Sequence, residues 1–157
     1  MVVRVQSEDF DSGAEIASFE RQAALAGAGA VATFTGLVRG QDGAGEATIG
    51  AMTLEHYPGM TERQLETIEA EAQKRWPLAG TLIIHRYGRL EAGARIVLVC
   101  AASSHRDAAF EACSFLMDWL KTKAPFWKRE ETPDGAHWVE AKASDDTRAE
   151  AWGIPKP

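Results

Sequence analysis

The feature that most constrains this fold is a pair of apolar segments that leads directly into a helical pattern. Residues 80–87 and 95–102 are rich in Ile, Val and Leu, and a turn around Glu91-Ala92-Gly93 joins them, which is typical of two β-strands. After a predicted capping box at Ser104-His105-Arg106-Asp107, apolar residues recur at the spacing of one helix face until Pro125. The residues expected to face the core are Ala109, Phe110, Cys113, Leu116, Met117 and Leu120.

The rest of the chain predicts strands and helices that complete an α+β fold. Further strands are expected at 2–6, 30–39, 47–55, 126–131 and 136–142, and further helices at 13–25 and from a capping box at Thr61-Glu62-Arg63-Gln64 to Trp76-Pro77. The strands 30–39 and 47–55 are expected to form a hairpin around a mobile loop at 40–46. Residues 144–157 are expected to form a polar tail that holds a helical turn or two. The pattern predicts one α+β domain over residues 1–157, with a mostly antiparallel sheet and helices packed on it.

Composition excludes several classes of protein. A content of 45% hydrophobic and 25% charged residues in a chain of 157 is ordinary for one globular domain. A net charge of -6 and a pI near 5.2 argue against nucleic acid as a partner, and no segment approaches the ~20 apolar residues that would cross a membrane. The start, Met1-Val2-Val3-Arg4-Val5, is typical of a strand and not of a signal peptide. Cys100 and Cys113 lie in apolar contexts without a CxxC motif, so we expect buried free thiols and a cytoplasmic protein.

A cluster of four cations follows the predicted helix and stands out in this acidic chain. Lys121, Lys123, Lys128 and Arg129 lie in a stretch that contains no acid, and Phe126-Trp127 precedes the second pair. Cations set among large apolar side chains are partly desolvated, which strengthens their pull on an anion and favours release of a proton from a lysine. The cluster predicts a site for an anionic small molecule, with a lysine taking part in the chemistry. Taken singly, Lys121 is also compatible with a partner of the helix dipole, and Lys128 with an ordinary surface residue.

Two further segments carry groups suited to an anion. At Ser103-Ser104-His105-Arg106 a strand leads into a helix N-terminus, where free backbone N–H groups, hydroxyls, an imidazole and a guanidinium can bind phosphate. Arg39 stands where a predicted strand meets the glycine-rich loop, from which it can close over an anion. The alternatives stay open at this point: Ser104 as a simple cap with solvated neighbours, and Arg39 as an exposed charge at a strand end.

No cofactor or metal motif accompanies these groups. The His, Cys, Asp and Glu residues have no metal-ligand spacing, and no glycine loop matches a nucleotide fingerprint. His85 lies in an apolar strand and is expected to be a core histidine and not a ligand. Glu130 and Glu131 have no carboxylate partner at a catalytic spacing.

Four segments closely resemble the large, catalytic subunit of molybdopterin synthase. They are FTGLVR at 34–39, LEHYPGMT at 54–61, SHR at 104–106 and KTKAPFWKRE at 121–130. The second and fourth strings are long and rich in rare residues, and the resemblance runs from about residue 30 to residue 142.

The resemblance implies an activity and a set of partners. Enzymes of this family convert cyclic pyranopterin monophosphate into molybdopterin by adding two sulfurs that form a dithiolene. The sulfur arrives as a thiocarboxylate on the C-terminal glycine of a small ubiquitin-like partner, whose Gly-Gly tail enters the pocket of the large subunit. Two large subunits form the homodimer at the centre of a heterotetramer. No cofactor and no metal is implied.

The same likeness assigns roles to residues. Lys121 and Lys128 match the catalytic lysines of the family. The residues that match its substrate-anion and pocket positions are Arg39, His105, Arg106, Arg129 and Glu130. Phe34 belongs to a matching segment and is a further candidate for the pocket. Lys142 stands where the family often has arginine, so it keeps the charge but loses the planar fork.

Helix dimensions constrain how these residues can act together. His105 and Lys121 lie at opposite ends of one predicted helix, roughly 24 Å apart at a rise of about 1.5 Å per residue. A pterin-sized ligand cannot touch both within one chain, so either they serve different sites or a second subunit completes the site. Two other functions compete with the enzyme: a non-catalytic subunit that binds an acidic peptide or a nucleotide through the same basic patch, and a phosphate-ester enzyme that uses His105 as acid or base.

Overall fold

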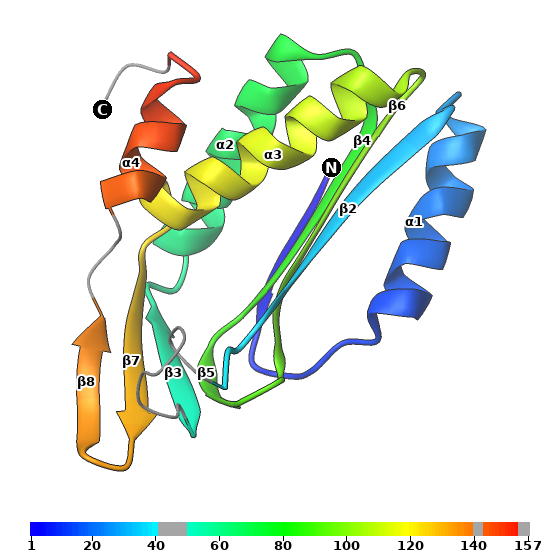
Figure 1. The fold of residues 1–157 in the computed structure, drawn as a ribbon. Helices are drawn as coiled ribbons and strands as arrows, with labels where there is room; N and C mark the ends of the chain where they lie inside the picture. The colour runs from blue at the N-terminus through cyan, green and yellow to red at the C-terminus, as the bar shows by residue number, and fades with distance from the viewer. Residues whose placement is uncertain (41–49, 140–142, 154–157) are drawn as a thin grey trace.

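A computed structural model describes residues 1–40, 50–139 and 143–153 of the protein. These residues form two four-stranded sheets and four helices (Figure 1). In chain order the elements are β1 (Val2–Gln6), α1 (Ser12–Leu25), β2 (Ala30–Leu37), β3 (Ala51–His56), α2 (Met60–Arg75), β4 (Leu78–Arg86), β5 (Gly88–Glu91), β6 (Arg95–Ser103), α3 (Arg106–Lys123), β7 (Phe126–Thr132), β8 (Gly135–Val139) and α4 (Ala143–Glu150). The predicted α+β class is confirmed, although the strands form two sheets.

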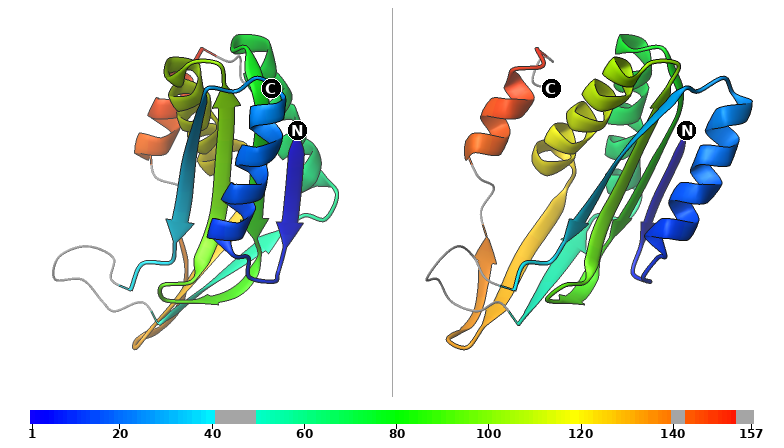
Figure 2. Two further views of the ribbon diagram at one scale, coloured as in Figure 1. Left: turned by 90° about the vertical axis from the view of Figure 1, so that its right-hand side faces the viewer. Right: turned by 45° about the vertical axis from the view of Figure 1, so that its right-hand side comes forward.

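The first sheet is covered by helices on both faces. Its strand order is β1-β4-β6-β2, and only the β1–β4 pair is parallel. Side chains alternate along each strand, so Ile83 and Val99 pack with α2 and α3 while Ile84 and Leu98 pack with α1. Figure 2 shows α1 on one side of this sheet and α2 with α3 on the other. This double burial explains why residues 80–87 and 95–102 are nearly continuous apolar runs.

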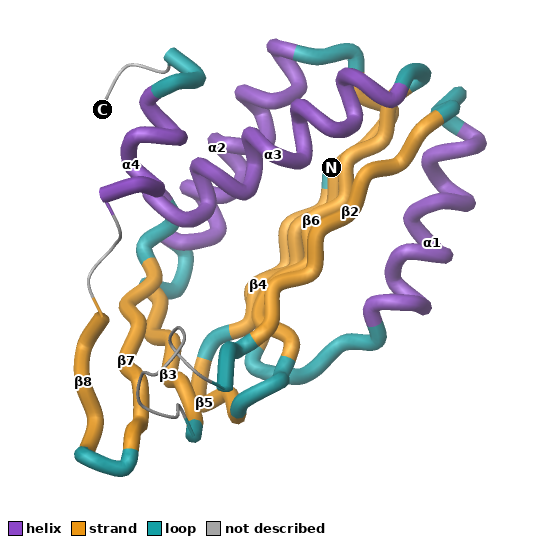
Figure 3. Tube along the Cα trace, in the orientation of Figure 1, coloured by secondary structure: helices purple, strands orange, loops and turns teal. Residues whose placement is uncertain are grey.

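The second sheet lies beyond the C-terminal end of α3 and has the order β5-β3-β7-β8, all antiparallel (Figure 3). It contributes Met52, Leu54 and Leu90 to a small core of its own. The predicted hairpin of 30–39 with 47–55 is wrong, because β2 pairs with β6 while β3 pairs with β5 and β7. The intervening chain is long enough to join strands of different sheets, so nearness in sequence did not decide the pairing.

Helices α2 and α3 both begin at residues other than those that the predicted capping boxes implied. Helix α2 begins at Met60, and the Glu62 carboxylate accepts a hydrogen bond of 2.6 Å from the Gly59 backbone N–H. Gly59 has a φ of 80°, which a residue with a side chain would adopt only with strain. Helix α3 begins at Arg106 after His105, whose side chain makes no cap. The predicted boxes therefore identified the right turns and missed the residues that start the helices.

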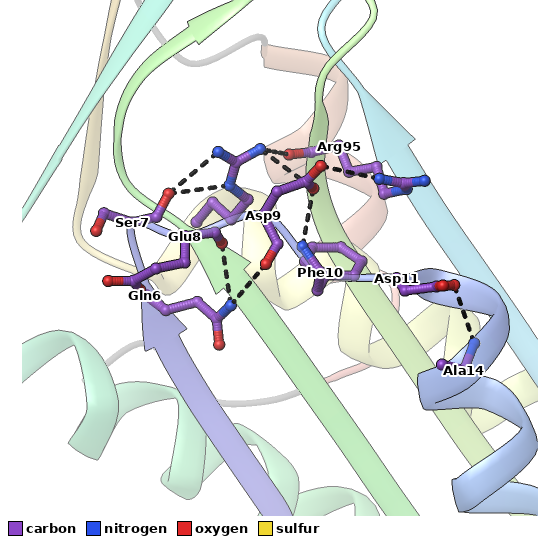
Figure 4. A network of polar contacts seen from close by, with 9 residues as sticks. Gln6, Ser7, Glu8, Asp9, Phe10, Asp11, Ala14 and Arg95 are labelled. Atoms are coloured by element: carbon purple, nitrogen blue, oxygen red, sulfur yellow. Dashed lines mark hydrogen bonds and ion pairs between the residues drawn. The ribbon is translucent and has the colours of Figure 1, made fainter.

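A polar network fixes the chain between β1 and α1 to the far end of β4 (Figure 4). The Arg86 guanidinium donates to the Ser7 carbonyl at 3.1 and 3.2 Å and to the Arg95 carbonyl at 3.1 Å. The Asp9 carboxylate accepts from the Phe10 backbone N–H at 2.8 Å and from Arg95 at 3.0 Å, and these bonds hold the pKa of Asp9 below its ordinary value. The network thus anchors Arg86, the residue directly after His85.

Residues 143–153 pack on the body of the protein. Residues 143–150 form α4, and the Asp118 carboxylate on α3 accepts hydrogen bonds from Arg148 at 3.1 Å and from the Trp152 indole at 2.8 Å. Ala149 is buried in the main core. The loop predicted at 40–46 lies, apart from Gly40, outside the described residues. Within the described part of the chain, no helix is long and apolar enough to cross a membrane.

Candidate functional site

A pocket of about 760 Å³ opens where the two sheets and the C-terminal end of α3 meet. Its described lining comes from eight elements of the fold and the short segments beside them. Among the lining residues are Phe34, Arg39, His85, Lys121, Phe126, Lys128, Glu130, Ser144 and Asp145. Five of the residues predicted for the site are thus brought together: Phe34, Arg39, Lys121, Lys128 and Glu130.

Strand β7 places the residues at the end of the KTKAPFWKRE segment alternately on two faces. Successive side chains of a strand point to opposite sides, so Phe126, Lys128 and Glu130 line the pocket. Arg129 is exposed on the other face, where its neighbours across the ladder are Thr53 and Trp138. The structure does not bring Arg129 into the pocket, and its role stays a prediction.

Lys128 and Glu130 form an ion pair inside the pocket. The Lys128 Nζ lies 3.3 Å from the Glu130 Oε1, one strand repeat further along β7. The Glu130 residue is only 9% exposed, whereas the Lys128 side chain is 42% exposed. A buried carboxylate needs such a partner, so Lys128 and Glu130 hold each other in place.

The two lysines at the end of α3 point in different directions. Lys121 lines the pocket, whereas the Lys123 Nζ lies 5.5 Å from the centroid of the Trp119 ring. Residues at positions i and i+2 of a helix point in directions about 200° apart around the axis, which accounts for the divergence. Among the described residues none forms an ion pair with Lys121.

A bulge in the β2–β6 ladder lies beside the pocket wall that carries Phe34 and Arg39. Gly36 pairs with Val97 and Leu37 with Arg95, so the extra residue is Ile96 of β6, and a bulge of this kind bends the strand pair locally. A Cβ on Gly36 would lie 2.7 Å from a methyl carbon of Val97, so only glycine fits this crossing. Past the bulge, Arg39 lines the mouth of the pocket as an exposed cation.

Two contacts fix the remaining walls. The Thr61 hydroxyl donates to the Pro125 carbonyl at 3.3 Å, which ties the start of α2 to the turn between α3 and β7. On the opposite side, the bonds from Asp118 dock α4, whose residues Ser144 and Asp145 line the pocket. The polar tail predicted from the sequence therefore contributes a wall.

His85 is a pocket residue that sequence reasoning assigned to the core. It is only 6% exposed, as expected for a core histidine, yet it is one of the residues that line the pocket. Burial lowers the pKa of His85 to about 4, and the neighbouring Lys121 and His56 add to the effect. The one signal in the sequence was a titratable residue at the end of an otherwise apolar strand.

His105 and Arg106 do not line this pocket in the same chain. They are exposed at the N-terminal end of α3, while Lys121 lies in its last turn. The separation expected from helix length is therefore present in the fold. Lys142 lies outside the described residues.

Both cysteines are buried and free, as predicted. Burial raises the pKa of the Cys100 thiol to about 12 and that of the Cys113 thiol to about 11. Neither lines the pocket, so neither supplies a thiolate to it. Within the described ranges, no group of three or more His, Cys, Asp and Glu side chains is placed to hold a metal ion.

The charges of the pocket are suited to an anionic ligand. Its described lining holds the cations Arg39, Lys121 and Lys128 and the carboxylates of Glu130 and Asp145. Since Glu130 is paired with Lys128, Arg39 and Lys121 remain as cations whose charge a ligand can meet. Phe34 and Phe126 add flat apolar surface, so an aromatic anion matches the pocket in both charge and shape.

Comparison with known proteins identifies the family of this chain. The model of the family described as MoaE protein matches residues 5–123. The molybdopterin synthase catalytic subunits of Pseudomonas aeruginosa and Mesorhizobium japonicum are each 52% identical over 152 residues, covering 97% and 96% of this chain and 99% and 92% of theirs. The solved structure of the molybdopterin biosynthesis MoaE protein from Burkholderia ambifaria superposes with a TM-score of 0.80 at 47% identity, covering 98% of this chain and 99% of that one.

Proposed function

Because the chain belongs to the MoaE protein family, we propose that it is the catalytic subunit of a molybdopterin synthase, a sulfurtransferase that converts cyclic pyranopterin monophosphate into molybdopterin. The observation that carries the proposal is the pocket itself. It gathers the family-matched Arg39, Lys121 and Lys128 beside aromatic side chains, although these residues are far apart in the sequence. A phosphorylated pterin is an aromatic anion of the kind that such a pocket accepts.

The sulfur donor is a small ubiquitin-like partner that ends in a Gly-Gly thiocarboxylate. The relatives are catalytic subunits by name, which supports an enzyme of more than one kind of chain. A thiocarboxylate is itself an anion, so the cations of the pocket attract the partner's tail as well as the pterin. The buried, protonated thiols of Cys100 and Cys113 are consistent with sulfur that comes from another chain.

Lys121 and Lys128 carry the chemistry in this proposal. Opening the cyclic phosphate and expelling oxygen from the pterin side chain each require a proton, which an ammonium group in the pocket can deliver. Lys128, held by Glu130, stabilises negative charge that develops on the transferring carboxyl group. Lys121 has no described ion-pair partner, so we assign it the proton transfer. Arg39, at the mouth, binds the phosphate.

The remaining predicted residues act around this centre. His105 and Arg106 bind substrate anion in the pocket of the other subunit of a homodimer, because helix length removes them from the pocket of their own chain. Arg129 supports the same strand from its outer face, Lys142 contributes a further cation, and Phe34 contacts the pterin. The protein acts in the cytoplasm, where the thiols of Cys100 and Cys113 stay reduced.

Reconstitution tests this function directly. The purified chain is mixed with a thiocarboxylated ubiquitin-like partner and cyclic pyranopterin monophosphate, and dithiolene product is measured. We expect two sulfurs to be transferred per pterin and two partner tails to be converted to carboxylates. Partner binding without any dithiolene product would favour the non-catalytic alternative, in which the same basic patch only binds an acidic peptide.

A further inference from the structure

The His85 imidazole is held in one orientation and one tautomer. Its Nδ1 lies 2.8 Å from the Arg86 carbonyl oxygen, and since a carbonyl only accepts, Nδ1 carries the proton. The ring stacks on Phe126 with centroids 3.8 Å apart and an interplanar angle of 17°. The Arg86 side chain is itself tied to Ser7 and to the Arg95 carbonyl, so the backbone that orients His85 is anchored. Nε2 is therefore the unprotonated nitrogen, and the direction of its lone pair is fixed.

His85 belongs to a pocket with a mostly apolar lining, in which most of the other polar side chains are charged. His85 and Lys121 both line the pocket, and they are close enough for the lysine charge to disfavour protonation of the imidazole. In the part of the chain that the structure describes, no residue donates a hydrogen bond to Nε2. Because Nε2 has no partner and is not one of the buried side-chain polar atoms, it is open to the pocket, where a charged donor such as an ammonium group would bind it most strongly.

We propose that His85 is a positioning residue for Lys121, whose ammonium donates a hydrogen bond to His85 Nε2 when the pocket is occupied. The inference rests on the proposed function and adds a residue to it. It gives the two lysines different surroundings: Lys128 is held by the carboxylate of Glu130, whereas Lys121 is oriented by a neutral acceptor. A neutral acceptor fixes the direction of the ammonium group and leaves its charge and its proton available to the substrate.

Two variants of His85 separate the acceptor from the shape of the ring. His85→Phe keeps the stacking on Phe126 and removes both nitrogens, whereas His85→Gln places an amide oxygen near the position of Nε2. We expect His85→Phe to lower kcat about tenfold or more with a smaller change in KM for the pterin, and His85→Gln to stay within about threefold of wild type. His85→Asn, which can still donate to the Arg86 carbonyl, should behave like His85→Phe, and it serves if the phenylalanine variant does not fold.

A double variant tests whether the effect passes through Lys121. In a Lys121→Ala background, His85→Phe should cause no further loss of sulfur transfer, because the group that His85 positions is already absent. Multiplicative losses would overturn the proposal and assign His85 to the substrate or to the fold. Equal losses in His85→Gln and His85→Phe would overturn it as well.

A measurement without substrate keeps this inference distinct from the proposed function. The rate at which an amine-reactive ester acylates Lys121 is followed by peptide mass spectrometry in saturating inorganic phosphate, which occupies the pocket as an anion without any sulfur transfer, with Lys123 as the internal control. We expect His85→Phe to change the Lys121 rate by about threefold or more and to leave Lys123 unchanged. If wild type makes no dithiolene but this rate responds, the proposed function fails and the positioning stands. If wild type is active and neither kcat nor the Lys121 rate responds, the positioning fails.

Discussion

The two ends of helix α3 carry similar basic residues in opposite surroundings. At the C-terminal end, Lys121 lines a pocket together with Arg39 and Lys128, and walls from both sheets enclose it. At the N-terminal end, His105 and Arg106 are exposed, and the only ion pair of Arg106 within the described ranges is a solvated contact with Asp107 at 3.8 Å. One end of the helix is built into a site, and the other end presents the same chemistry to solvent.

The contrast teaches that a motif and a site are different things. Helix α3, the turn at Pro125 and strand β7 position Lys121 and Lys128 within one chain, so their placement is a property of the fold. Nothing described in this chain converges on His105. Residues that match one family pocket therefore fall into a group that the chain assembles alone and a group that it does not, which we propose that a second copy completes. The following predictions test that division.

The largest effect is expected at the pocket end. Lys121→Ala should reduce sulfur transfer by about a thousandfold, because it removes the group assigned to proton transfer. Since Lys121 is exposed to the pocket and forms no described ion pair, the melting temperature should hardly change. Dithiolene formation by the purified, folded variant is the measurement. Turnover near that of wild type would remove Lys121 from the catalytic site and undo the comparison.

Lys128→Ala should be nearly as severe, with a loss of about a hundredfold in kcat. Unlike Lys121→Ala, it should also destabilise the protein by about 1 kcal/mol, because Glu130 is left buried without its partner. Lys128→Arg is the matched control, since it keeps the ion pair and alters only the shape of the cation. A loss of activity without any loss of stability would mean that the pair with Glu130 is not formed in solution.

The neutral His85 should make the pocket end sensitive to acid. Unfolded His85 binds a proton near pH 6.5 and folded His85 only near pH 4, so falling pH favours the unfolded chain. Between about pH 7 and about pH 5, wild type should lose about 2 kcal/mol more stability than His85→Phe. The titratable groups that act on His85 are Lys121 and His56, and the buried Glu69, whose pKa is raised by burial, is common to both proteins. Equal acid sensitivity in urea titrations would contradict a buried neutral imidazole.

Sequence reasoning predicted the first sheet better than the choice of helix face. The runs in β4 and β6 are apolar on both faces, so few alternatives compete for them. On α3, Phe110 was expected in the core and is 65% exposed, whereas Phe115 and Trp119 are buried and were missed. Helix α3 carries apolar residues on both sides of the predicted core face. Which side is buried depends on Trp76 and Trp152, which come from distant parts of the chain and pack against Phe115.

The site was predictable where charge pattern and strand alternation coincide. Lys121 and Lys128 followed from the cation cluster, and Arg39 from its place after a strand. Glu130 came only with the family likeness, and Arg129 was grouped with it although alternation along β7 sends the two to opposite faces. His85 could not be predicted, because burial and stacking decide whether a histidine in a strand faces a core or a cavity.

The exposed end of α3 can be tested by mixing subunits. Lys121→Ala and His105→Ala chains should each be inactive alone, and about half of the dimers are mixed after random exchange. If each site takes Lys121 from one chain and His105 from the other, a mixed dimer regains one intact site of its two. Roughly a quarter of wild-type activity should then return. No recovery, despite subunit exchange proven by mass spectrometry, would mean that both residues act within one chain or that His105 has no role.

The smallest effect is expected for Lys123→Ala, although Lys123 lies in the same last turn as Lys121. Its ammonium lies over the Trp119 ring and not in the pocket, so the variant loses only a cation–π contact. Sulfur transfer should stay within about twofold of wild type, and stability should fall by less than about 1 kcal/mol. The comparison with Lys121→Ala keeps charge and helix position nearly constant and changes only the direction of the side chain. Equal losses at both positions would mean that the net positive charge of this region, and not the pocket that α3 builds with β7, attracts the substrate.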